Sequence, residues 1–478
     1  MKKSLIIVLS MLLVMGFAVS AFAIHATMPA ETNAVVAPKG TEIRLGGEIR
    51  IRGWYRDNVT NDAGTANAES GRPYSGGSMS KYDERVRINI DAKLSPNVSG
   101  RLQLQTSSTT WGVTNTATND GGRLLGDGGI RFREAWIAYT GTGLLGVTAG
   151  LKLGHMPFMI GAGEFVDHRP FGDDAIVLWI EPAKGTDITL SSVKVYESSV
   201  TGRNRDDWDM YTLMVAHKLD KDNTIGLDLS LGTTSDMDVT TAPYTGHGDA
   251  EMNLWNLGLN AKGKVAGPGL GYNASIDLQF GNIKDITVAP EKRKFRGYGI
   301  VAGLNYMVDP VTLRGMVAYG SGDKIDSADK NEGFQVFGAI DADLGRYTVV
   351  YDGTVTTAAH YDGTQGIQGR TRGTGIANTT IYNMGLTVSP MKDVTARLDY
   401  FLLRASKKLS NTADAFGNSK KIGSELDLRL SYKLGAGLTY FINSGILFAG
   451  DFYKAAATGI TSDPKNAVVA QHGVTLVF

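Results

Sequence analysis

Apolar and polar residues alternate with a period of two over many short segments of this chain. The pattern is clearest in the segments 42–55, 85–94, 270–280 and 424–434. In the second of them every even position from Val86 to Leu94 is apolar, and every odd position is charged or an amide. Because successive side chains of a β-strand point to opposite faces, each segment predicts a strand with one apolar and one polar face. An amphipathic helix would repeat its apolar positions every three to four residues instead.

The connections between these segments predict how the strands are joined. Tight turns rich in Gly, Pro, Asn and Asp alternate with longer polar stretches. The turns include 95–97, 181–185, 220–223, 267–269, 308–310, 389–392 and 435–437, and the long stretches include 56–81, 109–129, 232–249 and 355–378. This asymmetry is typical of all-β, antiparallel, up-and-down transmembrane β-barrels with short periplasmic turns and long extracellular loops. We count about 20 strands, with 18 as the alternative, because 175–180 is apolar on both faces and 132–139 has an ambiguous phase.

The first residues predict export from the cytoplasm. Lys2 and Lys3 precede an apolar run from Leu5 to Val19, and Ala21-Phe22-Ala23 has the small-x-small pattern that signal peptidase cleaves. A membrane anchor is the alternative, but it needs roughly 20 apolar residues and this run is shorter. The predicted organisation is a signal peptide at 1–23, a short periplasmic segment at 24–41 and one β-barrel domain at 42–478.

Composition excludes several classes of protein. The chain has 48 Lys and Arg against 48 Asp and Glu, and loss of the signal peptide removes two lysines, so nothing favours nucleic acid as a partner. It has no cysteine, and therefore no disulfide, thiolate metal site or haem-attachment motif. Beyond the signal peptide no apolar run is long enough for a transmembrane helix, so an exported chain that enters a membrane must close a barrel. A soluble β-sandwich would not need short and long connections to alternate throughout.

The last strand carries a pattern known from other exported barrels. Its sequence Val474-Thr475-Leu476-Val477-Phe478 ends on an aromatic residue, with apolar residues at alternate positions before it. It resembles the C-terminal assembly signal of bacterial outer-membrane proteins, in which Val474, Leu476 and Phe478 would be the recognised residues. The resemblance implies the barrel-assembly machinery as a partner.

Two internal stretches resemble known outer-membrane families. Phe132-Arg133-Glu134-Ala135-Trp136, followed by the segment 150–157, is similar to the strand pair that leads into the inward-folded third loop of porins. The segment 423–428 with 448–452 is similar to the last hairpin of alginate-export-type barrels. These resemblances imply an outer-membrane porin, for which a homotrimer is one assembly.

The polar faces of the first three predicted strands carry a row of basic residues. They are Arg44, Arg50, Arg52, Arg85, Arg87, Lys93 and Arg101. If these faces line the lumen, the low-dielectric wall focuses their field and predicts a modest preference for anions. In the alternative interpretation, acids on other strands pair with these residues and only keep the lumen polar. Those acids are Asp277, Asp399, Glu425 and Asp427.

The porin resemblance places the segment 156–171 inside the pore as a constriction loop. Its candidate residues are His155, Glu164, Asp167, His168 and Arg169. An acid facing a basic wall would create a transverse field at the narrowest point, and such a field orients dipolar solutes. The alternative is an external loop capped by its own salt bridges. His155 stands where porins usually have a basic residue.

These features predict a water-filled channel of the outer membrane for small hydrophilic or anionic solutes, in contact with outer-membrane lipid and lipopolysaccharide. We predict no enzyme activity, cofactor or metal site, because the scattered histidines form no nucleophile motif and no metal-ligand spacing. Two other functions stay open. One is a selective channel for an anionic polysaccharide or another specific substrate. The other is the barrel sheath of a cytochrome electron conduit, in which a partner would supply all the haem.

Overall fold

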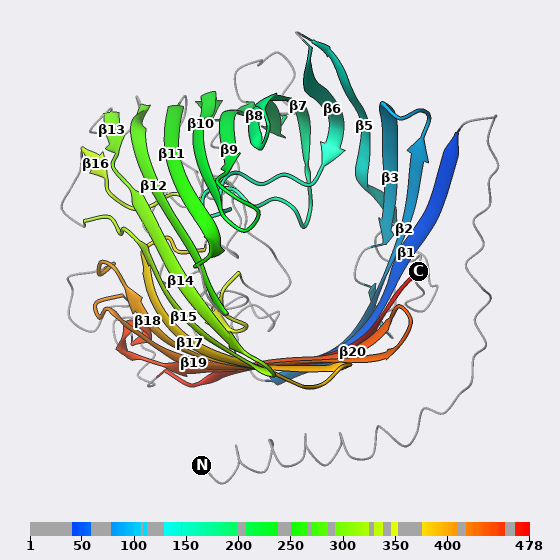
Figure 1. Cartoon of the computed structure of the whole chain (residues 1–478). Coiled ribbons are helices and arrows are strands. Elements are labelled where there is room, and N and C mark those ends of the chain that lie inside the picture. The colour runs from blue at the N-terminus through cyan, green and yellow to red at the C-terminus, as the bar shows by residue number, and fades with distance from the viewer. Residues whose placement is uncertain are drawn as a thin grey trace.

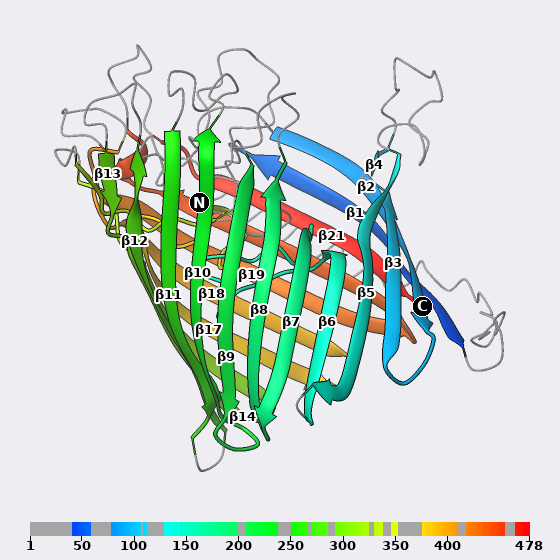
Figure 2. The same ribbon diagram turned by 90° about the horizontal axis from the view of Figure 1, so that it is seen from above.

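The strands of this chain form one antiparallel β-barrel, as Figure 1 shows looking along its axis and Figure 2 shows from the side. The computed structural model describes residues 41–58, 78–106, 109–111, 129–144, 146–197, 207–237, 250–265, 269–284, 292–324, 329–337, 346–351, 375–409, 417–454 and 464–478. The predicted signal peptide at 1–23 and all but the last residue of the predicted periplasmic segment at 24–41 lie outside these residues.

The elements, in chain order, are β1 (Glu42–Asp57), β2 (Ser78–Lys93), β3 (Val98–Thr106), β4 (Thr109–Thr110), β5 (Ile130–Leu144), β6 (Val147–Met156), β7 (Asp173–Ala183), β8 (Thr186–Tyr196), β9 (Trp208–Lys218), β10 (Thr224–Met237), β11 (Ala250–Lys264), β12 (Leu270–Lys284), β13 (Lys292–Phe295), β14 (Tyr298–Val308), β15 (Val311–Gly320), β16 (Lys330–Asn331), β17 (Thr379–Met391), β18 (Val394–Ala405), β19 (Lys421–Gly435), β20 (Leu438–Ala449), the 3-10 helix η2 (Asp451–Tyr453) and β21 (Ala467–Val477). Within the described residues, no helix is long and apolar enough to cross a membrane.

Eighteen of the described strands form the wall of the barrel. Each pairs with the next wall strand along the chain, and β1 pairs with β21, where Ile49 lies opposite Leu476. The short pieces β4, β13 and β16 add pairings beside β2, β12 and β13 at one end and do not cross the wall. The structure therefore has the predicted alternative of 18 strands rather than 20. Ring closure leaves no open sheet edge, as a membrane barrel requires.

Exposure alternates along the wall strands as the period of two predicts. In β14, Gly299 and Val301 are buried, whereas Ile300 and Leu304 are 41% and 58% exposed. Exposed aliphatic and aromatic side chains recur on the same face of the other strands, up to 76% exposure for Met384. This apolar outer face is the one that lipid covers in a transmembrane barrel.

The connections differ in length at the two ends of the barrel. Connections of two to five residues follow β2, β5, β7, β9, β11, β14, β17 and β19. The other connections between wall strands are longer and include 157–172 and 321–378. Bacterial barrels carry their short turns at the periplasmic end. We therefore take the end with the long connections as the outer one.

Loop 157–172 and the described parts of connection 321–378 lie inside the barrel and form an apolar core there (Figure 1). Phe165 and Val166 of loop 157–172 pack with Met210 and Leu254 on the inner faces of β9 and β11. In connection 321–378, Phe334, the segment 349–351 and Ile376 pack with inner-face residues of β15 to β21. The inner face is therefore partly apolar where a loop covers it, beside polar residues such as Glu425 and Asp427.

Glycine on the inner face lets connection 321–378 lie directly on the wall. A Cβ atom at Gly445 of β20 would lie 2.4 Å from Asp427 Oδ1, 2.8 Å from Val350 Cγ2 and 3.1 Å from Val349 Cβ. Only a residue without a side chain leaves room for the docked segment at this position.

We predict that Gly445→Ala destabilises the folded protein by roughly 1–3 kcal/mol, because the added methyl group overpacks this contact. The free energy of unfolding in urea, measured in lipid vesicles, tests the prediction. Gly315→Ala in β15 is the matched control, since a Cβ atom there meets nothing within 4 Å. Equal unfolding free energies for Gly445→Ala and the unsubstituted protein would contradict the docking role.

Candidate functional site

The seven basic residues predicted for the lumen lie on one face of the first three strands. Arg50 of β1 lies opposite Arg85 of β2, and Glu48 lies opposite Arg87. The other face of the same strands carries exposed aliphatic residues such as Leu45, which is 64% exposed. The basic face is therefore the inner one. We call it the basic wall: Arg44, Arg50, Arg52, Arg85, Arg87, Lys93 and Arg101.

Acids on the same strands neutralise part of the basic wall. Asp83 accepts a 2.8 Å bond from Arg52 and lies 3.9 Å from Arg50. Glu48 accepts a 2.6 Å bond from Arg85. The inward acids of the described parts of β1 and β2 are Glu42, Glu48, Asp83 and Asp91. They are fewer than the seven basic residues, so the basic wall keeps an excess of positive charge.

The four distant acids named in the alternative interpretation have other partners, and the arginines of the basic wall pair instead with acids of neighbouring strands. Asp277 accepts a 2.8 Å bond from Asn256. Glu425 accepts the N–H groups of Val350 and Tyr351 at 2.6 and 2.8 Å. Asp427, the next inward-facing residue of β19, accepts the N–H of Val349 at 2.9 Å. These last two carboxyl groups hold connection 321–378 against the wall.

A second group of arginines faces the lumen on β15, β18 and β19, and the sequence analysis did not predict it. Arg314 of β15 bonds to Asp399 of β18 at 2.9 Å, and Arg397 bonds to the same carboxyl group at 2.5 Å. Arg397 lies opposite Arg429 of β19. The group thus places three guanidinium groups near Asp399, and Asp427 also acts on Arg429. Each strand contributes one member, so no local run of basic residues reveals it.

Loop 157–172 meets connection 321–378 at a buried cluster of charges. Arg346 bonds to Glu164 at 2.9 Å and to Asp167 at 3.1 Å, and the hydroxyl of Tyr347 donates to Glu164 at 2.6 Å. The side chains of Glu164 and Asp167 are 3% and 7% exposed. Arg169, in contrast, is 57% exposed while it binds Asp167 at 2.6 Å. The structure thus brings these three predicted loop residues together.

Burial and charge oppose each other in this cluster. Burial disfavours the charged form of Asp167, but hydrogen bonds and charge from Arg169, with the charge of Arg346, hold the pKa of Asp167 below its usual value. Burial likewise disfavours the charged form of Arg346, but Glu164, Tyr347 and Asp167 raise the pKa of Arg346. The stabilisation from Asp167 is therefore present above its unfolded pKa and is lost as the pH falls through its lowered folded pKa.

The two candidate histidines differ in position. His168 is fully buried, and its Nδ1 and Nε2 atoms each lie 2.8 Å from an acceptor, Asp173 Oδ2 and the carbonyl oxygen of Phe337. His155 instead lies 3.0 Å from Asp174 Oδ1, which is exposed on the outer face of β7, and 3.0 Å from the carbonyl oxygen of Phe171. His155 therefore contacts the end of loop 157–172 but not the buried cluster of Glu164 and Asp167.

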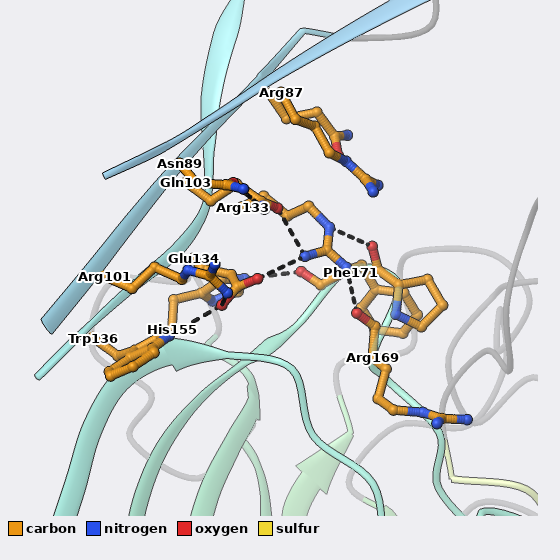
Figure 3. A network of polar contacts seen from close by, with 12 residues as sticks. Arg87, Asn89, Arg101, Gln103, Arg133, Glu134, Trp136, His155, Arg169 and Phe171 are labelled. Carbon is orange, nitrogen blue, oxygen red and sulfur yellow. Dashed lines mark hydrogen bonds and ion pairs between the residues drawn. The ribbon is translucent and has the colours of Figure 1, made fainter. Parts of the chain in front are cut away.

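A β-bulge in β5 adds Arg133 to the site. Gln103 lies opposite Glu134 and Leu104 lies opposite Phe132, so Arg133 is the extra residue and lies on the inner side together with Glu134. Its guanidinium group donates to Gln103 at 2.9 Å and to the carbonyl oxygens of Pro170 and Arg169 at 3.0 and 2.5 Å (Figure 3).

The contacts of Arg133 attach the end of loop 157–172 to the wall strands. Beside it, Lys152 Nζ lies 3.9 Å from the ring centroid of Trp136, whose Nε1–H donates to Glu134 at 3.0 Å. The loop is thus held at two points, near its end by Arg133 and in its middle by Arg346.

The residues of the predicted assembly signal lie at the seam of the ring. Leu476 lies opposite Ile49 and Val474 opposite Ile51. The carbonyl oxygen of Phe478 accepts the N–H of Gly47 at 2.8 Å. The last strand therefore closes the barrel at these residues.

We predict that Arg133→Ala raises the unit conductance and the current noise in a planar bilayer, because it releases the end of loop 157–172. The loss of hydrogen bonds from a charged donor should also cost roughly 1.5–3 kcal/mol of unfolding free energy. Arg131→Ala is the matched control, since Arg131 is an exposed residue of the same strand. Identical conductance traces for the two variants would show that Arg133 does not restrain the loop.

We predict that Arg346→Met destabilises the protein by about 3–5 kcal/mol, because it leaves the buried Glu164 without a cation and Asp167 with only the exposed Arg169. Adding Glu164→Gln and Asp167→Asn should restore part of this loss in a mutant cycle measured by urea unfolding. Lys324→Met, which breaks an exposed pair with Glu332, is the control and should cost about 0–1 kcal/mol. The absence of any recovery in the triple variant would disprove the pairing.

The chain resembles solved outer-membrane barrels and matches one family model. It is similar to OpdK of Pseudomonas aeruginosa, solved with vanillate, at 10% identity and a TM-score of 0.50, covering 91% of this chain and 98% of that one. It is similar to OccAB2 of Acinetobacter baumannii at 11% identity and a TM-score of 0.50, with the same coverage of 91% and 98%. These likenesses show the fold alone. No curated protein matches. The family model described as alginate export matches residues 45–466, and the chain therefore belongs to the alginate export family of porin-like outer-membrane barrels.

Proposed function

We propose that this outer-membrane barrel is a non-enzymatic channel through which small hydrophilic solutes or ions diffuse passively, with a preference for anions. The observation that carries the proposal is the excess of inward-facing guanidinium groups on the basic wall. A second group of inward-facing arginines, Arg314, Arg397 and Arg429, lies on β15, β18 and β19. Inward-facing cations of both groups lower the energy of an anion in the lumen.

The acids of loop 157–172 do not cancel this field. Glu164 and Asp167 are buried against Arg346, and Arg169 also binds Asp167. The group that this cluster exposes most is the cation Arg169. The constriction that the loop forms under this proposal therefore presents little uncompensated negative charge to a passing solute.

Selective passage of an anionic polysaccharide is the second candidate function. Membership of the alginate export family favours it. The basic wall favours it too, because it extends along the strands from Arg52 in the outer half to Lys93, the last residue of β2 before a periplasmic turn. A polyanion could contact several of these groups at once. Block of the channel current by micromolar alginate, with no block by neutral dextran of the same length, would favour this function over simple diffusion.

The structure gives less support to a sheath for a cytochrome. Loop 157–172 and the described parts of connection 321–378 occupy the inner side of the barrel, where such a partner would lie. We further propose the barrel-assembly machinery as the partner that inserts the last strand, and a homotrimer as the assembly.

We predict a reversal potential that shows anion preference when the refolded protein separates two KCl solutions of different concentration in a planar bilayer. Arg50→Gln with Arg87→Gln should move this potential toward the cation side, because two inward charges are removed. Lys184→Gln with Lys221→Gln, at exposed periplasmic turns, removes the same charge outside the basic wall and should leave it unchanged. Cation preference of the unsubstituted protein would refute the proposal.

A further inference from the structure

Along the outer face of β13 and β14, the exposed side chains change from basic to aromatic, then to aliphatic and back to aromatic. Burial alternates strictly here, with Phe295, Gly297 and Gly299 buried and the even positions exposed. From the outer end toward the periplasmic turn, the exposed positions are Lys292, Lys294, Arg296, Tyr298, Ile300, Ala302, Leu304 and Tyr306. Figure 2 places β13 and the periplasmic end of β14 at opposite ends of the wall.

This order matches the layers of a membrane. Tyr298 and Tyr306 bracket an apolar stretch, as the aromatic girdles of barrels bracket their apolar band. Eight residues at about 3.3 Å each give roughly 26 Å along the strand, or about 20 Å along the membrane normal at a tilt near 40°. Lys292, Lys294 and Arg296 therefore lie just beyond the outer girdle, at the level of the lipid headgroups.

Neighbouring strands add cations at the same level. Lys284, the last residue of β12, lies opposite Lys292, and Lys330 of β16 lies opposite Lys294. On β12, Phe280 and Leu278 continue the same face as Lys284 and are 39% and 44% exposed. We call the four residues Lys284, Lys292, Lys294 and Arg296 the outer basic patch.

The outer basic patch brings like charges together with little compensation from the protein. Lysines directly opposite each other across a strand pair destabilise a sheet. On the described parts of β11 to β14, the acid on this face is Glu251, which lies opposite Lys284. Asp329 precedes Lys330, and its carbonyl oxygen accepts the N–H of Lys294 at 2.9 Å. An external anion would relieve the repulsion between the remaining cations.

The position of the outer basic patch limits which kinds of anion can reach it. It lies on the outer face, so a solute that crosses the lumen does not meet it. A molecule that contacts it at headgroup level and also covers Ile300 and Leu304 must carry both an anionic head and acyl chains. We propose that the outer basic patch binds the phosphate groups of a phosphorylated glycolipid of the outer leaflet, of the lipopolysaccharide class.

The test measures binding of fluorescent bisphosphorylated lipid A to the refolded full chain in detergent micelles. Substituting Lys284→Gln, Lys292→Gln, Lys294→Gln and Arg296→Gln together should raise the apparent Kd at least tenfold. The matched control combines Lys184→Gln, Lys218→Gln, Lys221→Gln and Lys262→Gln, which removes four exposed charges at or near the periplasmic turns and should leave the Kd unchanged. Unaltered channel conductance in both variants shows that the barrels are folded.

Two further probes separate the possible sources of the phosphate. Dephosphorylated lipid A should lose the affinity that the patch variant loses, and millimolar inorganic phosphate should not displace the bound lipid. Equal binding of lipid A to the patch variant and the unsubstituted protein would overturn the proposal. Displacement by inorganic phosphate at low concentration would also overturn it, since the patch would then bind free anions rather than lipid.

Discussion

The pairing of β1 with β21 is the contact on which the rest of this structure depends. Hydrocarbon offers no hydrogen-bond partner, so every N–H and C=O group of a membrane-spanning strand must be satisfied within the chain. A sheet that stayed open would expose two unpaired edges to lipid. Because the ring closes, each strand has a fixed inner and outer face, and the period of two in the sequence becomes a separation of lipid from lumen. The placement of all lumen charges follows from this closure.

Closure of the barrel also limits which loop segments can enter the lumen. A loop that enters the lumen brings backbone donors with it, and these need partners as much as the wall does. Two wall carboxyl groups, Glu425 and Asp427, take the three successive N–H groups of residues 349–351. Apolar side chains of both loops pack on the inner face where the wall is apolar or lacks a side chain. The polar lumen predicted for such a barrel therefore contains a true apolar core on the loop-covered side.

What the sequence predicted is the part of the structure that depends on local periodicity. Alternation gave the strands and their inward faces, and hence the position of all seven residues of the basic wall. The ambiguous phase of 132–139 has a physical cause, because the bulge at Arg133 puts two successive residues on the same side. The partner of Glu164 and Asp167 could not be predicted, since Arg346 is about 180 residues away and no periodic pattern links them. The same holds for Arg314, Arg397 and Arg429, which only the strand register brings together.

The near-zero net charge of the chain hides an uneven distribution inside the barrel. Lumen carboxyl groups that bind a loop, such as Glu164 and Glu425, lie beside a guanidinium group or backbone N–H dipoles that offset their field. The carboxyl groups of Asp83 and Asp399 each lie within 4 Å of two arginines. Acids thus fix loops and space arginines, and on the basic wall Arg50 and Arg52 share Asp83 while Arg85 and Arg87 share Glu48. A chain with equal numbers of acids and bases can therefore enclose a lumen whose field favours anions.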